Sequence, residues 1–163
     1  GVRSASAAGL RKPALRRLLR QLIDRPDLFA EHEHFGPLAR KLGIRERSTV
    51  LTVGAPGGFM RLLDPIPHGV RIGNRYRSAD VVVVFARTKP QMRSGVERAM
   101  RAIPTNGAIW LCWPKKASGE VVPLQDRSVI TDHCFPLGLV DVKVAAIDAT
   151  WSGLKFVIRT ELR

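Results

Sequence analysis

The most constraining feature of the sequence is an unbroken run of five apolar residues, Val81–Phe85, that directly follows Asp80. A strand with one face in water alternates apolar and polar residues, whereas a strand buried on both faces of a sheet is apolar throughout. Strands of the second kind occur almost only in parallel sheets that helices cover on both sides. The run therefore predicts an α/β protein rather than a helical bundle or a sandwich.

The rest of the chain supplies the other strands and helices that such a fold needs. Helix-like spacing alternates with apolar runs, with helices expected at 37–43, 90–103 and 126–139 and strands at 49–53, 70–73, 107–113, 140–147 and 154–158. The segment Asp148–Gly153 joins the last two strands and is too short for a crossover helix. We therefore expect an α/β, Rossmann-like sheet that is mostly parallel and ends in an antiparallel hairpin, an outline that resembles the methyltransferase architecture.

The composition excludes several classes of protein. The chain has 163 residues, enough for one domain, and its two cysteines are too few for a disulfide framework or a four-thiolate zinc site. No apolar stretch approaches the ~20 residues that span a bilayer, so we expect no integral membrane association. The 27 Lys and Arg against 14 Asp and Glu give a net charge of +13, which favours a polyanionic partner such as RNA or a ribonucleoprotein.

Nearly half of this excess charge lies in residues 1–25, which predict a basic tail and a helix. Apolar residues recur at helical spacing between Pro13 and Pro26, at Leu15, Leu18, Leu19, Leu22 and Ile23. This helix is expected to dock on the domain, to lie on an anionic membrane surface or to bind RNA, and the segment also resembles an organellar transit peptide. The sequence thus divides into a basic segment, 1–26, and a Rossmann-like domain, 27–163, in the cytoplasm or, if the segment is a transit-peptide remnant, in an organellar matrix.

A glycine-rich loop, Gly54–Phe59, directly follows the predicted strand at 49–53, where open α/β sheets bind ligands. Glycine lets the backbone adopt positive φ and approach a ligand closely. The loop resembles the G-A-x-P-G-G-[FW] loop of the heat-shock RNA 2′-O-methyltransferase family, which binds S-adenosylmethionine. That resemblance implies a cofactor site whose candidate residues are Gly54, Pro56, Gly57, Gly58 and Asn74.

The acidic residues that usually accompany this loop are absent from the sequence. The end of the second strand offers Asn74 and Arg75 rather than a carboxylate, and Ala86 and Arg87 stand where the family's catalytic aspartate is expected. If the protein is an enzyme, Lys41 and Lys115 are the candidate catalytic lysines. The missing carboxylates favour a domain without catalytic activity and without a cofactor.

Two tryptophan motifs carry a second resemblance. The segments W-P-K-K-A-S-G, at 113–119, and T-W-S-G-L-K-F, at 150–156, resemble a small bacterial family of conserved proteins that share a domain of unknown function. Its members also share the P-L-A-x-K-L-G opening found at 37–43. The resemblance implies a Rossmann-like fold and no particular activity.

Basic residues outside the glycine loop are the candidate nucleic-acid contacts: Arg11, Lys12, Arg16, Arg17, Arg20, Arg75, Arg77, Lys115 and Lys116. Trp113 and Trp151 offer aromatic faces on which a base can stack. The segment Glu31–His34 carries metal-capable side chains, but alternate residues do not share a helix face, so no metal site is expected.

The leading hypothesis is therefore a non-catalytic Rossmann-like domain that binds RNA or a ribonucleoprotein through an Arg-rich surface. The first alternative is an S-adenosylmethionine-dependent methyltransferase, acting on RNA, that uses the Gly54–Phe59 loop. The second is a scaffold that recruits a protein or membrane partner through its N-terminal helix.

Overall fold

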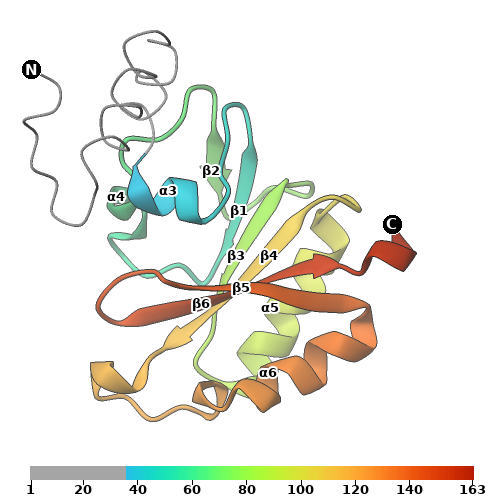
Figure 1. The fold of residues 1–163 in the computed structure, drawn as a ribbon. Coiled ribbons are helices and arrows are strands. Elements are labelled where there is room, and N and C mark those ends of the chain that lie inside the picture. Colours follow the sequence, from blue (N-terminus) through green and yellow to red (C-terminus); the bar gives the residue numbers. More distant parts are fainter. Residues whose placement is uncertain (1–35) are drawn as a thin grey trace, which may run out of the picture.

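A computed structural model describes residues 36–163, so the N-terminal segment and its predicted helix lie outside the described residues. The described part contains a six-stranded sheet with the order β2-β1-β3-β4-β6-β5 (Figure 1). Its strands are β1 (Thr49–Val53), β2 (Arg71–Gly73), β3 (Val81–Phe85), β4 (Ala108–Pro114), β5 (Leu139–Ala146) and β6 (Trp151–Ile158). Its helices are α3 (Pro37–Lys41), α4 (Phe59–Leu62), α5 (Lys89–Ala102) and α6 (Arg127–Cys134), with 3₁₀ turns at Lys116–Ser118, Pro123–Gln125, Phe135–Leu137 and Thr160–Leu162.

The predicted fold class is confirmed. Strands β2, β1, β3 and β4 are parallel, and β6 runs antiparallel to both β4 and β5. All five residues of β3 are buried at the centre of the sheet, which explains their uninterrupted apolar character. The carboxyl ends of β1, β3 and β4 consequently meet at one edge of the sheet, and their amino ends meet at the other.

Helices cover both faces of the sheet and divide the core in two (Figure 1). On one face, α5 and α6 pack against Val82, Val84 and Leu111. On the other, α3 and α4 pack against Val83 and Trp110. The start of α5 is fixed by a capping box in which Thr88 and Gln91 satisfy each other's backbone N–H groups, which is why this helix begins sharply after β3.

The structure differs from the sequence-based prediction in three places. Helix α4 has only four residues and carries no periodic signal, so the sequence did not predict it. Helix α6 ends at Cys134, because Pro136 continues the chain as a 3₁₀ turn. Strand β6 begins at Trp151 rather than at residue 154, because Asp148 Oδ1 accepts the N–H groups of Thr150 and Trp151 and closes a tight hairpin turn.

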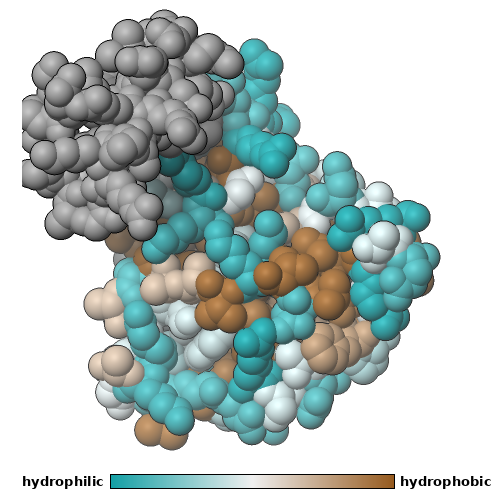
Figure 2. Space-filling model, viewed as in Figure 1, coloured by the Kyte–Doolittle hydropathy of each residue, from teal (hydrophilic) through white to brown (hydrophobic). Residues whose placement is uncertain are grey.

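Hydrophobic groups also reach the surface on edge strand β5. Val142 and Val144 are about half exposed, and the face drawn in Figure 2 shows brown patches near the position of β5 amid a mostly hydrophilic surface. A register shift between Asp141 and Lys143 interrupts this edge, as irregularities often do at strands open to further pairing. Among residues 36–163, no helix has the length and apolar character needed to cross a membrane.

Candidate functional site

The glycine loop lies between β1 and α4, at the carboxyl edge of the sheet. Gly54 has a φ of +70°, and a Cβ there would lie 2.9 Å from the carbonyl oxygen of Phe85, so only glycine fits. Gly58 caps α4 with a φ of +89°. A Cβ added to Gly57 or Gly58 would meet no atom within 4 Å. The loop therefore exposes bare backbone at its tip.

A cavity of about 230 Å³ opens beside this loop, between the ends of β1 and β3 and the first turns of α5. Gly54 and the segment Phe85–Arg87 form the part of its wall that comes from the sheet. Gln91, Ser94 and Trp151 contribute the rest of its polar and aromatic lining. This place, outside the carboxyl ends of parallel strands, is where open α/β sheets hold their ligands.

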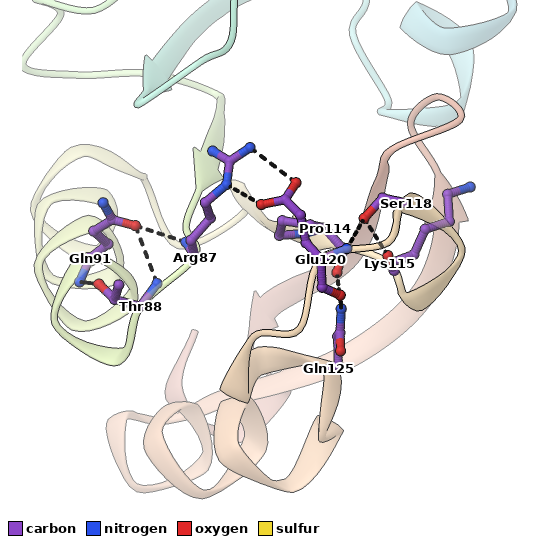
Figure 3. A network of polar contacts seen from close by, with 8 residues as sticks. All are labelled: Arg87, Thr88, Gln91, Pro114, Lys115, Ser118, Glu120 and Gln125. Carbon is purple, nitrogen blue, oxygen red and sulfur yellow. Dashed lines mark hydrogen bonds and ion pairs between the residues drawn. The ribbon is translucent and has the colours of Figure 1, made fainter.

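Arg87 is the charged residue of the cavity wall, and its side chain is held on two sides. Its Nε donates to Glu120 Oε1 at 2.7 Å, and its Nη2 donates to Oε2 at 3.3 Å (Figure 3). Its guanidinium carbon also lies 4.7 Å from the centre of the Trp151 ring. The hydrogen bond from Arg87 holds the pKa of the Glu120 carboxyl below its usual value.

The loop after β4 fixes Glu120 in place. Gln125 Nε2 donates to the carbonyl oxygens of Pro114, at 2.9 Å, and Glu120, at 2.8 Å (Figure 3). Ser118 Oγ donates to the Lys115 carbonyl oxygen at 2.7 Å and accepts the backbone N–H of Glu120 at 3.3 Å. These bonds fold the W-P-K-K-A-S-G segment into a compact loop, which presents Glu120 to Arg87.

The structure brings only part of the predicted cofactor set to the cavity. Gly54 lines it, whereas Pro56, Gly57, Gly58 and Asn74 do not. Asn74 is exposed at the end of β2, and its carbonyl oxygen accepts a hydrogen bond from Arg98 of α5. Arg75 and Arg77 follow it in the same exposed segment, as an interleaved charged loop predicts.

The two candidate catalytic lysines lie at different levels of the sheet. Lys115 follows β4 at the carboxyl edge, where its N–H donates to the Thr150 carbonyl oxygen at 2.8 Å. Lys41 lies elsewhere, because its carbonyl oxygen accepts a hydrogen bond from Lys143 Nζ at 3.4 Å. Lys143 is on β5, nearer to the edge of the sheet at which the parallel strands begin. No contact within residues 36–163 joins these lysines.

The two tryptophans lie on opposite faces of the sheet, so they do not form one stacking platform. Trp113 is half-buried against the face covered by α5 and α6. Trp151 is buried on the other face, where its ring packs edge-on against Phe85 with centroids 5.1 Å apart. The guanidinium of Arg87 already lies against the Trp151 ring, so that ring packs within the protein and does not offer a free face to a base.

Several predicted residues lie outside the described part of the chain: Arg11, Lys12, Arg16, Arg17, Arg20 and the segment 31–34. Within residues 36–163, no group of three or more His, Cys, Asp or Glu side chains is arranged to hold a metal ion.

Sequence reasoning missed Glu120, Gln91 and Ser94 as parts of the site. Gln91 was detectable, because a threonine three residues before a glutamine at a helix start is a capping signal. Glu120 had no comparable signal, since its role depends on a 33-residue separation from Arg87 that only the folded sheet closes.

No protein-family model and no curated protein sequence matches the chain. The W-P-K-K-A-S-G and T-W-S-G-L-K-F motifs therefore have no family model behind them, and the resemblance drawn from them stays a prediction.

The fold, in contrast, matches solved structures. A structure described as the DhpI–SAH complex, where SAH is S-adenosylhomocysteine, superposes with a TM-score of 0.53 and 12% identity over 89% of this chain and 92% of that one. TrmN from Thermus thermophilus superposes with a TM-score of 0.51 and 9% identity over 75% of this chain. The match spans only 47% of the TrmN chain. The ribosomal protein L11 methylase from Lactobacillus delbrueckii subsp. bulgaricus gives 0.50 and 10%, covering 75% of each chain.

These structures correct two predictions. The sequence favoured a non-catalytic RNA-binding domain, but the chains that share this fold include a methylase and a protein in complex with SAH. The same finding contradicts the expectation that no cofactor binds. Both predictions were drawn in part from the missing carboxylates, and the first also from the net charge of +13. The absence of individual carboxylates does not remove the glycine loop or the cavity beside it.

Proposed function

We propose that the protein is an S-adenosylmethionine-dependent methyltransferase that holds its cofactor at the Gly54–Phe59 loop. The observation that carries the proposal is the cavity between Gly54, Arg87 and Ser94, which opens at the carboxyl edge of a methyltransferase-like sheet. The likeness in fold to a methylase and to an SAH complex supports it.

The residues present fit such a cofactor at the glycine loop. Gly54 keeps the backbone low beside the Phe85 carbonyl, and the absence of side chains at Gly57 and Gly58 leaves room for close approach. Asn74 directly follows β2, and its amide both donates and accepts hydrogen bonds, as ribose hydroxyls require. Pro56 lies in the same loop, between Gly54 and Gly57 in the sequence. When bound, the cofactor supplies a methyl group to the substrate.

The side chains that line the cavity orient a substrate rather than remove its proton. Phe85 and Trp151 give the cavity an aromatic wall that excludes water. Arg87 presents a fixed positive charge there, and Glu120 is engaged by Arg87 and therefore is a weak base at neutral pH. Of the two candidate catalytic lysines, Lys115 lies at this edge and remains the proposed one, whereas Lys41 lies apart from it.

RNA is the proposed substrate class. Arg75 and Arg77 extend from the end of β2, and Lys115 and Lys116 from the end of β4, so both flanks of the cavity edge carry cations. The basic residues of the N-terminal segment would add to the affinity of the protein for RNA. A protein or membrane partner for the N-terminal helix remains a separate proposal, which deletion of residues 1–26 tests.

Isothermal titration of the full chain with SAH and with S-adenosylmethionine tests the proposal. We expect saturable binding of one ligand per chain. Transfer of a labelled methyl group to RNA but not to bulk protein would support the substrate class. No binding heat with either ligand at millimolar concentration would overturn the proposal.

A further inference from the structure

A second and larger cavity lies at the opposite edge of the sheet, far from the glycine loop. It encloses about 410 Å³ and is formed where Ser48, Asp80 and Gly107 lead into β1, β3 and β4. Its volume falls in the range of sites for small molecules, roughly 300–1,000 Å³. The proposed methyltransferase function makes no use of it.

A rigid turn places two arginines on the wall of this cavity. The Arg45 N–H donates to Ser48 Oγ at 3.1 Å, and the Ser48 N–H donates back to the Arg45 carbonyl oxygen at 3.1 Å. Arg47 has a φ of +63°, a conformation that costs an arginine on the order of 1 kcal/mol, and its N–H is held by the His68 carbonyl oxygen at 2.9 Å. Such strain persists where the surrounding structure enforces it, often at ligand sites.

Lys155 of β6 adds a half-buried positive charge to the cavity. It lines the cavity, and a Cβ added to Gly43 would be in ordinary van der Waals contact with its Nζ, at 3.8 Å. Lys143 is its register partner on β5. Burial, together with the positive charges of Lys143 and Arg45, lowers the pKa of Lys155. Within residues 36–163, no carboxylate pairs with Lys155, Lys143 or Arg45.

Of the two carboxylates that line the cavity, Asp80 is separated from Lys155. Asp80 precedes β3, and β4 lies between β3 and β6, so Asp80 and Lys155 are roughly 10 Å or more apart across the sheet. One oxygen of Asp80 is also occupied, since it accepts the Thr49 N–H at 2.9 Å. The second carboxylate, Glu46, also lines the cavity and lies in the turn between Arg45 and Arg47. The cavity therefore has a cationic end at Lys155 and an acidic, hydrogen-bonding end at Asp80.

We propose that this cavity binds a small molecule that carries a phosphate group, with the phosphate at Lys155 and Arg45, which line the cavity, and with Lys143 beside Lys155 on the neighbouring strand. Arginine and lysine side chains provide charge-assisted donors that phosphate oxygens accept, and arginine does so in a bidentate fashion. A bound anion would also relieve the repulsion among the three cations. Asp80 and Ser48 would then face the hydroxyl or amino groups of the ligand.

Calorimetric titration of the full chain with pyrophosphate and with ADP at low salt tests this proposal. The variant Lys155→Met keeps the apolar stem and removes the charge, and Arg45→Gln removes a second donor. Lys89→Met, an exposed lysine at the opposite edge, is the matched control. Thermal unfolding of each variant verifies that it is folded.

We expect saturable binding of pyrophosphate or ADP that weakens at least tenfold in Lys155→Met and in Arg45→Gln and is unchanged in Lys89→Met. Equal weakening in all three variants would overturn the proposal, because it would reveal only a diffuse charge effect. If neither pyrophosphate nor ADP binds, the proposal is overturned. That conclusion also holds if a single-stranded oligonucleotide binds while the two small molecules do not.

Discussion

The guanidinium carbon of Arg87 lies 4.7 Å from the centre of the Trp151 ring, so a cation covers the aromatic wall of the candidate cofactor cavity. Arg87 follows β3, Trp151 begins β6, and Glu120 holds the arginine from the loop after β4. The Arg87 side chain thus connects the ends of β3, β4 and β6 at the carboxyl edge of the sheet. At the end of β3, where the resemblance to RNA methyltransferases implies an aspartate, this chain thus has an arginine that lines the cavity and is held by Glu120.

Replacing Glu120 with glutamine should make the protein less sensitive to acid. Its hydrogen bond from Arg87 lowers the pKa of the Glu120 carboxyl below the ordinary value of 4.5. A lowered folded-state pKa stabilises the protein above the unfolded-state pKa, and this contribution is lost as the pH falls through the folded-state value. In urea unfolding, the free energy of unfolding should therefore be higher for wild type than for Glu120→Gln at neutral pH, and the difference should shrink and then vanish as the pH falls below 4.5 and through the lowered folded-state pKa. A difference independent of pH would contradict the assigned cause.

Gly57→Val should weaken cofactor binding without weakening the fold. A side chain at Gly57 meets no atom within 4 Å, and its backbone does not need positive φ, so valine is accommodated. The added methyl groups would occupy the space beside the loop that a bound cofactor requires. We expect an unchanged midpoint of urea unfolding and at least a tenfold higher Kd for SAH by calorimetry. Ala117→Val, in the exposed turn after β4, is the control and should alter neither quantity.

Strand and helix identity was readable from the sequence because burial leaves periodic signals. Val81–Phe85 and Lys89–Ala102 were predicted within a residue or two, since one is buried throughout and the other is amphipathic and capped. The glycine loop was placed by its position after β1. The Arg87–Glu120 pair and the cavity at Lys155 were not predictable, because each is assembled from segments whose proximity depends on strand order and register. The pair of tryptophan motifs suggested a shared aromatic face, yet strand pleating sends Trp113 and Trp151 to opposite sides.

Gly95→Ala should destabilise the packing of α5 on β3. A Cβ at Gly95 would lie 2.3 Å from Val84 Cγ1, well inside van der Waals contact, and both residues are buried. Overpacking of this kind costs about 1–3 kcal/mol, which chemical denaturation measures directly. The double variant Gly95→Ala with Val84→Ala removes the clashing methyl group. Its loss of stability should be smaller than the sum of the two single losses, and additivity would show that the helix had shifted away from the strand instead.

Trp110→Phe should destabilise the opposite face of the sheet more than its change in volume implies. The Trp110 indole Nε1 donates to the Leu42 carbonyl oxygen at 3.1 Å, and both residues are fully buried between β4 and α3. Phenylalanine fills part of the space but leaves this carbonyl without its donor, which costs about 1–3 kcal/mol beyond the lost packing. Trp113→Phe is the matched variant, since its indole makes no hydrogen bond within residues 36–163 and its side chain is only half-buried. We expect the free energy of unfolding measured in urea to be highest for wild type, lower for Trp113→Phe and lowest for Trp110→Phe. Equal losses in the two variants would mean that the bond to Leu42 contributes nothing, and that α3 is held to the sheet by apolar contacts alone.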